Sequence, residues 1–223
     1  MRLSSFLVFR YWFRCLIWRL GRKLYCLARQ ELCSVPKSNG EYWLIHFMLE
    51  KNSSDPAVLC DIGANEGNWA SEALRYSEVL GKEVIIHGFE PSADSFAHLK
   101  ELFRKPLVQL NNVALSSQAG VSSLFVRGTR CGINSLYGDG GGSPQDVYCE
   151  TLNNYCSKHA IGAIDLVKSD AEGHDFEVLK GAAILLSAGQ IKVWQFEYNH
   201  RWISARNYLR DVFFYSRKTV CYW

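Results

Sequence analysis

Short apolar runs alternate along most of the chain with segments whose apolar residues recur every three or four positions. The first pattern predicts buried strands, and the second predicts amphipathic helices. Because strands and helices in alternation build βαβ units, the chain is predicted to be an α/β fold with a mostly parallel, Rossmann-like sheet and helices on both faces. The predicted strands are residues 58–62, 83–89, 107–115, 164–169 and 191–198, and the helices between them are residues 68–80, 93–104 and 176–188.

Other segments are placed around this alternation. A lead-in helix is expected over residues 41–51, an inserted strand over 120–128 and a last helix over 205–214. Residues 138–144 contain four glycines and are expected to form a surface loop. We expect residues 129–150 and 197–205 to shape a substrate pocket.

The first 30 residues follow a helical pattern of their own. At 100° per residue one face is apolar and the other is basic and aromatic, which predicts an amphipathic helix. The apolar face holds Phe6, Phe9, Phe13, Leu16, Ile17, Leu20, Leu24 and Leu27, and the basic face holds Arg10, Arg14, Arg19, Arg22, Lys23 and Arg29.

This helix does not resemble a membrane span or a signal peptide. Arg10, Arg14 and Arg19 would each cost about 2.5–3.5 kcal/mol near the centre of a spanning helix. The uncharged run before them is short, and no small-residue cleavage site follows. Two interpretations stay open: residues 1–30 make peripheral contact with an anionic membrane, or their apolar stripe caps the folded domain.

Length and charge set further bounds. The 223 residues suit one core-forming domain, and we predict three segments: 1–32, a basic amphipathic helix; 33–56, a linker and lead-in helix; and 57–223, the folded domain. Residues 1–30 hold seven basic residues and no acid, so the remainder, with 18 basic and 22 acidic residues, is mildly acidic. A nucleic-acid substrate gains no support from this charge.

The eight cysteines do not form a usual metal pattern, and a chain of this size needs no disulfide framework. No metal site is therefore predicted. Reduced thiols favour a cytoplasmic location, either free or peripheral at a membrane surface.

The most informative motif is the turn after the first predicted strand, Asp61-Ile62-Gly63-Ala64-Asn65-Glu66-Gly67. Gly63, Ala64 and Gly67 allow a ligand to approach the backbone at the start of a helix. A dinucleotide fingerprint needs glycine where Asn65 stands, which argues against a nicotinamide-dependent oxidoreductase. The Asp61 carboxylate would repel a pyrophosphate and attract an ammonium group. S-adenosyl-L-methionine carries an ammonium group and no phosphate.

The next two strand ends supply further candidates, because ligands of open α/β sheets bind beyond the carboxyl ends of the strands. Glu90 can accept hydrogen bonds from both ribose hydroxyls, and Pro91 stops its strand abruptly. An amide from Asn112 can pair with an adenine edge, while Val113 covers the ring. Glu90 could also be a surface acid, and Asn112 a turn former.

The last two strand ends carry candidates for chemistry. Asp170 and His174 are the expected bases, with Glu172 as orienting group or alternate. Acids also favour helix N-termini without any catalytic role. The expected substrate contacts are Lys168, Glu197 and His200, although a histidine at position 200 is more often a surface residue.

The segments DIGANEG, GFEPSADSFAHL, NVALS, ETLNNYC, IDLVKSDAEGHDFEVLKGA and QFEYNHRW resemble the FkbM family of S-adenosylmethionine-dependent methyltransferases over about residues 55–215. The family pattern K-x-D-x-E-G-x-E is met except at Asp175, which replaces a glutamate. The resemblance implies a class I methyltransferase fold and O-methylation of a sugar or small-molecule hydroxyl. It implies cofactor contacts at Asp61, Gly63, Asn65 and Glu90, and an adenine site near Asn112 and Val113. Asp170 and Glu172 would face the methyl group and the acceptor.

The resemblance also implies two further antiparallel strands after residue 198, where the sequence leaves room for one short strand at most. This departure keeps an alternative open, a catalytically inactive, membrane-associated methyltransferase-like binding protein.

Overall fold

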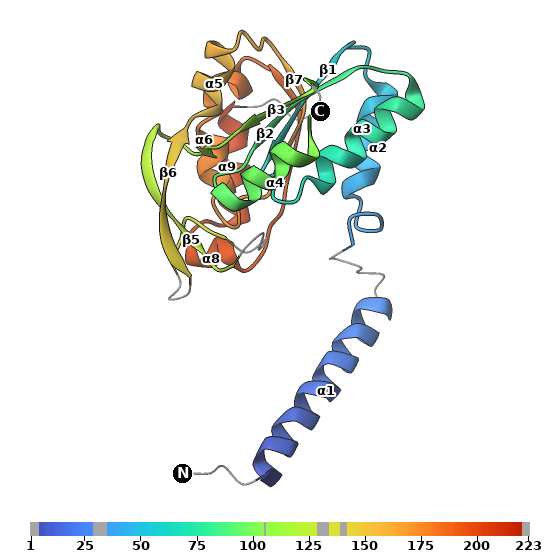
Figure 1. Cartoon of the computed structure of the whole chain (residues 1–223), viewed down its shortest axis with the longest axis vertical. Helices are drawn as coiled ribbons and strands as arrows, with labels where there is room; N and C mark the ends of the chain where they lie inside the picture. Colours follow the sequence, from blue (N-terminus) through green and yellow to red (C-terminus); the bar gives the residue numbers. More distant parts are fainter. Residues whose placement is uncertain (1–4, 29–34, 105, 129–133, 139–141, 220–223) are drawn as a thin grey trace. The chain divides into compact units, whose positions relative to one another are not determined.

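The computed structural model describes residues 5–28, 35–104, 106–128, 134–138 and 142–219 (Figure 1). The chain divides into two compact units, Met1–Leu44 and Ile45–Trp223. The first unit contains helix α1 (Ser5–Ala28), as the amphipathic pattern predicts, and the start of α2 (Glu41–Lys51). Within the described ranges, no helix has both the length and the apolar character needed to cross a membrane.

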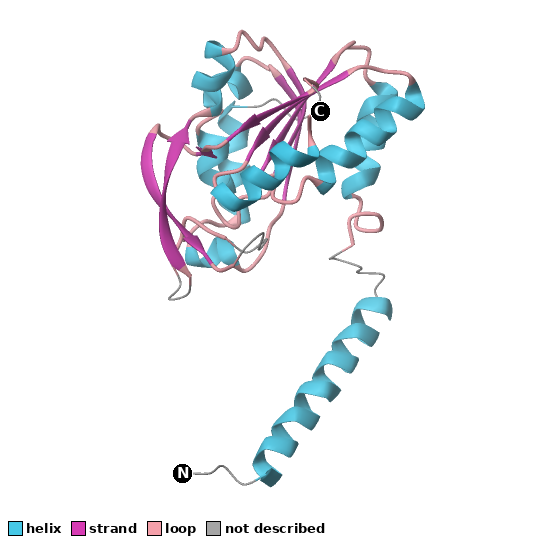
Figure 2. Cartoon of the chain, in the orientation of Figure 1, coloured by secondary structure: helices cyan, strands magenta, loops and turns pink. Residues whose placement is uncertain are grey.

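The second unit is built on a parallel sheet (Figure 2). Its strands within the described residues run in the order β3-β2-β1-β7-β8, and each neighbouring pair is parallel. The predicted α/β fold is confirmed. The strands are β1 (Ala57–Ile62), β2 (Val84–Phe89), β3 (Val108–Asn111), β7 (Ile164–Ser169) and β8 (Ile191–Phe196).

Helices cover both faces of this sheet (Figure 1). Side chains of α5, α6, α7 and α9 join the core that contains Cys60, Ile62 and Val167, while α3 buries Trp69 and Ala73 elsewhere in the core. The helices are α3 (Asn68–Leu80), α4 (Ala93–Leu102), α5 (Leu152–Lys158), α6 (Asp175–Lys180), α7 (Ala183–Ser187), α8 (Arg201–Ser204) and α9 (Leu209–Thr219).

The prediction of one strand over residues 107–115 is wrong. The chain leaves the main sheet after Asn111 and enters a second, smaller sheet at Ala114, three residues later. This sheet contains β4 (Ala114–Leu115), β5 (Gly120–Val126) and β6 (Ser143–Glu150) in the order β4-β6-β5. Apolar residues recur on both sides of Asn111 and Asn112, so the pattern alone did not show that the two parts belong to different sheets.

The inserted strand is confirmed as β5, but β6 was not predicted. The expected loop over residues 138–144 lies partly outside the described residues. Its last two residues, Ser143 and Pro144, belong to β6, where Pro144 pairs with Phe125.

The prediction of one helix over residues 176–188 is also wrong, because α6 ends at Lys180. A Cβ atom on Gly181 would lie 2.1 Å from the backbone oxygen of Ser116, so only glycine allows this approach. The helix expected over residues 205–214 starts later, at Leu209, after Arg206 adopts a left-handed conformation with φ of 55°.

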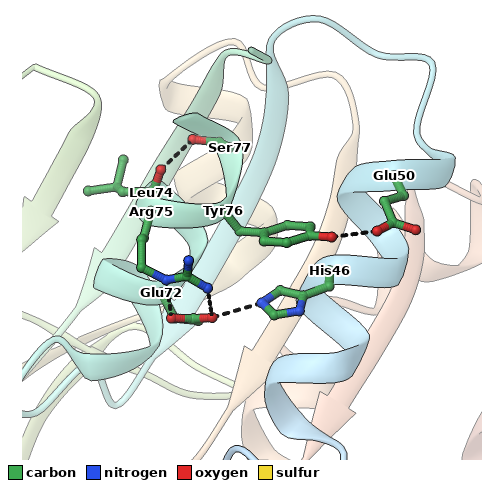
Figure 3. Close-up of polar contacts among 7 residues, drawn as sticks. All are labelled: His46, Glu50, Glu72, Leu74, Arg75, Tyr76 and Ser77. Atoms are coloured by element: carbon green, nitrogen blue, oxygen red, sulfur yellow. Dashed lines mark hydrogen bonds and ion pairs between the residues drawn. The ribbon is translucent and has the colours of Figure 1, made fainter. Parts of the chain in front are cut away.

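Within the second unit, α2 and α3 are joined by polar contacts (Figure 3). Glu72 accepts hydrogen bonds from His46 Nε2 at 2.8 Å and from Arg75 Nε at 2.9 Å. The rings of His46 and Tyr76 stack with their centroids 3.7 Å apart, and the Tyr76 hydroxyl donates to Glu50. Glu72 therefore links its own helix to the preceding one.

Glu72→Gln should lower the free energy of unfolding at pH 7 by up to about 1 kcal/mol. The hydrogen bond from Arg75 lowers the pKa of Glu72 from 4.5 to about 2. Because the folded-state pKa is the lower one, the stabilisation is complete above pH 4.5 and is lost as the pH falls through 2. Urea unfolding at pH 7 and pH 3 should show the difference shrink at the lower pH. Glu101→Gln, an exposed acid on α4, is the control, and an equal loss in both variants would contradict this role.

Candidate functional site

The turn after β1 brings the backbones of β1 and β7 together. Gly63 has φ of 76°, and a Cβ atom there would lie 2.1 Å from the carbonyl oxygen of Asp170. The N–H groups of Gly63 and Ala64 donate to the carbonyl oxygen of Phe89 at 2.9 and 3.1 Å. Asn65 is left-handed with φ of 46°, a conformation that asparagine tolerates better than most residues.

The end of this turn is glycine for a steric reason. Gly67 has φ of 75°, and a Cβ atom there would lie 2.6 Å from the Phe103 ring. It precedes α3, whose first N–H groups have no partner within the helix and face the turn.

Glu90 connects the turn to the end of β2. Its Oε2 accepts a hydrogen bond from the Asn65 N–H at 2.8 Å, and its Oε1 accepts one from the Ser92 N–H at 2.9 Å. Burial raises the pKa of Glu90, while these two hydrogen bonds oppose the shift. Each carboxylate oxygen keeps a further lone pair that a ligand hydroxyl could use.

Asn112, just after β3, hydrogen-bonds to the backbone at the end of β2. Its Nδ2 donates to the backbone oxygens of Glu90 and Pro91, at 2.8 and 3.1 Å. Because the amide nitrogen already donates to the backbone, a hydrogen bond with an adenine would have to be accepted by the amide oxygen. The expected adenine contact stays a prediction.

A charged group is buried where β1 and β7 end. Asp61 is paired in register with Lys168 and is completely buried. Lys168 Nζ lies 3.5 Å from Asp61 Oδ1 and 3.6 Å from Asp170 Oδ2. Neither oxygen of Asp61 has a well-aligned hydrogen-bond partner among the described residues, although the Lys168 ammonium and the Ala70 N–H lie near them. Burial raises its pKa, and the Lys168 charge opposes that rise.

Glu172 occupies a strained position beside this group. Its φ is 51°, its backbone oxygen accepts a hydrogen bond from Ser135 Oγ at 3.0 Å, and its carboxylate lies 2.7 Å from Arg201 Nε. Burial and, next, the charge of Asp170 raise the pKa of Glu172 to about 7. A carboxyl group with this pKa can exchange a proton near neutral pH.

His174 is held between two hydroxyl groups of other segments. Its Nδ1 lies 3.1 Å from the Tyr137 hydroxyl oxygen, and its Nε2 lies 2.9 Å from Ser116 Oγ. Burial lowers the pKa of His174 to about 4, so the ring is neutral at pH 7. One nitrogen donates and the other accepts, and the ring links the β7–α6 loop to the segments around the small sheet.

Asp175 stabilises the same loop from within. Its carboxylate accepts hydrogen bonds from Ser169 Oγ at 2.6 Å and from the N–H groups of Ala171 and Gly173 at 3.0 and 3.3 Å. The residue that differs from the expected glutamate therefore has a structural role here.

The remaining predicted substrate residues lie further out. Glu197 is exposed as a whole residue. Partial burial of its carboxylate and, next, the charge of Asp170 raise its pKa. His200 is exposed at the start of α8. Their roles stay predictions.

These elements line an open cleft. The cleft brings together eight predicted residues: Gly63, Asn65, Glu90, Pro91, Val113, Asp170, Glu172 and His174. Seven predicted residues do not line it: Asp61, Ala64, Gly67, Asn112, Lys168, Glu197 and His200.

The small sheet lines one side of the cleft, and the sequence did not predict most of these residues. Ala114, Leu115, Leu124 and residues 134–136 line the cleft from that side. The last of these fall in the range expected to shape a pocket. Ala114 and Leu115 gave a weak signal, because two-residue β4 has no detectable periodicity.

Comparison with known proteins identifies the family. The model of the methyltransferase FkbM domain matches residues 61–217. The chain belongs to the FkbM methyltransferase family. The crystal structure of methyltransferase FkbM from Methylobacillus flagellatus KT is similar to it, with 16% identity and a TM-score of 0.55, over 88% of this chain and 48% of that one. This likeness supports the fold.

A second solved structure, the CMeT domain of the citrinin polyketide synthase, matches with 12% identity and a TM-score of 0.36, over 81% of this chain and 46% of that one. No curated protein matches this chain. The chain spans about half the length of these two solved structures.

Gly63→Ala should lower the free energy of unfolding by about 2–4 kcal/mol, because the methyl group meets the Asp170 carbonyl and φ is positive. Gly81→Ala is the matched control. Its φ is +63° and no atom lies within 4 Å of the added Cβ, so only the conformational cost of about 1–2 kcal/mol applies. Urea unfolding compares the two, and equal losses would refute the close approach at Gly63.

Proposed function

We propose that this FkbM family chain transfers a methyl group from S-adenosyl-L-methionine to a hydroxyl oxygen of a sugar or other small molecule. The observation that carries the proposal is the placement of two buried carboxylates at neighbouring strand ends: Glu90, which lines the cleft, and Asp61, which does not line it and lies beside Lys168. When bound, S-adenosyl-L-methionine supplies a methyl group on a positively charged sulfur.

The chemistry of the residues present fits this cofactor. The orphaned oxygens of Asp61 would attract its ammonium group, and Lys168 would attract its carboxylate. Glu90 would accept hydrogen bonds from the ribose hydroxyls. Val113 and Pro91 offer apolar surface for the adenine. Gly63 leaves the turn without a side chain.

The geometry favours Glu172 over His174 as the group that takes the acceptor proton. Both nitrogens of His174 are engaged by hydroxyl groups, and the low pKa opposes protonation. Glu172 lines the cleft and has a pKa of about 7. Asp170, also in the cleft, raises that pKa and remains a second candidate. Arg201 holds the Glu172 carboxylate in place.

Glu90→Gln should weaken S-adenosylmethionine binding by about 10- to 100-fold, the effect of losing hydrogen bonds to a charged group. Isothermal titration calorimetry measures the affinity. Asp94→Asn, an exposed acid on α4, should bind as the native chain does. If Glu90→Gln binds S-adenosylmethionine with unchanged affinity, Glu90 is not a contact of this cofactor and the proposed site is wrong.

Glu172→Gln should slow methyl transfer by about 10²–10⁴-fold while the cofactor still binds. The acceptor would first be found by screening hydroxylated sugars and metabolites for methyl uptake by mass spectrometry. Because the base must be deprotonated, the native rate should rise as the pH passes through about 7 and level off above it. The variant should lose that rise.

Full turnover by Glu172→Gln with an unchanged pH profile would contradict its role as base. Cofactor binding without methyl transfer to any acceptor would instead favour the inactive binding protein.

A further inference from the structure

Helix α1 carries positive charge without any acid. Five basic residues and no aspartate or glutamate occur in Ser5–Ala28. Arg10 and Arg14 are four residues apart, as are Arg19 and Lys23, so like charges lie next to each other along the helix and disfavour it in water. A surface of opposite charge would relieve this repulsion.

The helix also has an apolar stripe that the described residues of its own unit leave exposed. Phe9, Phe13, Ile17, Leu20 and Leu24 lie on one side and are each about half or more exposed. Phe9 and Phe13 stack on each other with ring centroids 6.2 Å apart. An exposed apolar stripe of this length marks an interaction surface.

Aromatic side chains distinguish between the surfaces that could cover this stripe. Trp12 lies near the border between the two faces, while Tyr11 and Trp18 lie among the basic residues, with the Arg22 guanidinium 5.5 Å from the Trp18 ring centre. Aromatic rings and basic side chains together are typical of helices at the headgroup level of a membrane. A second copy of the helix would bring like charges together.

We propose that α1 binds the surface of a membrane rich in anionic lipid, with its apolar stripe among the acyl chains and its basic side chains at the headgroups. The helix lies in the plane of the surface, since its arginines and lysine oppose crossing. This inference is independent of the proposed methyl transfer.

The test uses the full chain and lipid vesicles, with binding measured by sedimentation. Vesicles of phosphatidylcholine with about 30% phosphatidylserine should pellet the protein, and phosphatidylcholine alone should not. Raising NaCl from about 0.1 M to about 1 M should release much of it, because the Debye length shortens from about 10 Å to about 3 Å. Replacing Arg10 and Arg14 with glutamine should weaken binding about fivefold for each charge.

A matched pair of substitutions tests the orientation of the helix. Phe13→Gln lies on the apolar stripe and should weaken binding to the anionic vesicles by about tenfold or more. Tyr11→Gln makes a similar change on the opposite face and should weaken it by less than about threefold.

Three results would overturn the proposal. The first is equal binding to both kinds of vesicle, or to neither. The second is a dimer by light scattering that Phe13→Gln dissociates without lipid. The third is a fall in the melting temperature of Phe13→Gln with no loss of vesicle binding, which would place the stripe on the folded domain.

Discussion

The structure depends on a lysine ammonium placed between two carboxylates at the carboxyl ends of β1 and β7. Buried charges are costly unless they are paired, and Lys168 at about 3.5 Å offsets part of the cost of burying Asp61. The ion pair leaves the oxygens of Asp61 without a well-aligned hydrogen bond from the described residues. The carboxylate oxygens of Asp61 can therefore still accept hydrogen bonds, and an ammonium group can donate them.

The other features of the site follow from how the neighbouring segments pack around this group. The close approach of Gly63 to the Asp170 backbone sets the distance between the two strand ends. Glu90 holds the adjacent turn, and His174 fastens the loop after β7 to Ser116 and Tyr137. The small sheet thereby closes one side of the cleft. Its contribution is packing and enclosure, whereas the charges come from the main sheet.

Much of the main sheet could be predicted from sequence, because its buried strands and amphipathic helices leave clear periodic signals. The turn at Asp61–Gly67 was recognisable for the same reason, since glycine at positive φ and a polar strand end are local features. The breaks at Asn111 and Gly181 were not recognisable, since Gly181 approaches the distant Ser116 backbone and the Asn111 side chain donates to the Tyr155 hydroxyl. The same limit applies to His174: a histidine in a helix N-terminus looks available for catalysis until its partners, Ser116 and Tyr137, are known. Asp61 was expected to attract an ammonium group, yet it does not line the cleft and lies beside Lys168, so a ligand ammonium group must enter next to Lys168 to reach it.

The central claim is that Asp61 recognises the ammonium group of the ligand. It is tested most directly by comparing two ligands that differ in that group. S-adenosylhomocysteine contains the amino-acid portion, and methylthioadenosine lacks it. Measured by calorimetry, Asp61→Asn should weaken S-adenosylhomocysteine binding by about tenfold or more and leave methylthioadenosine binding unchanged. Equal losses for both ligands, or no loss for either, would contradict the account.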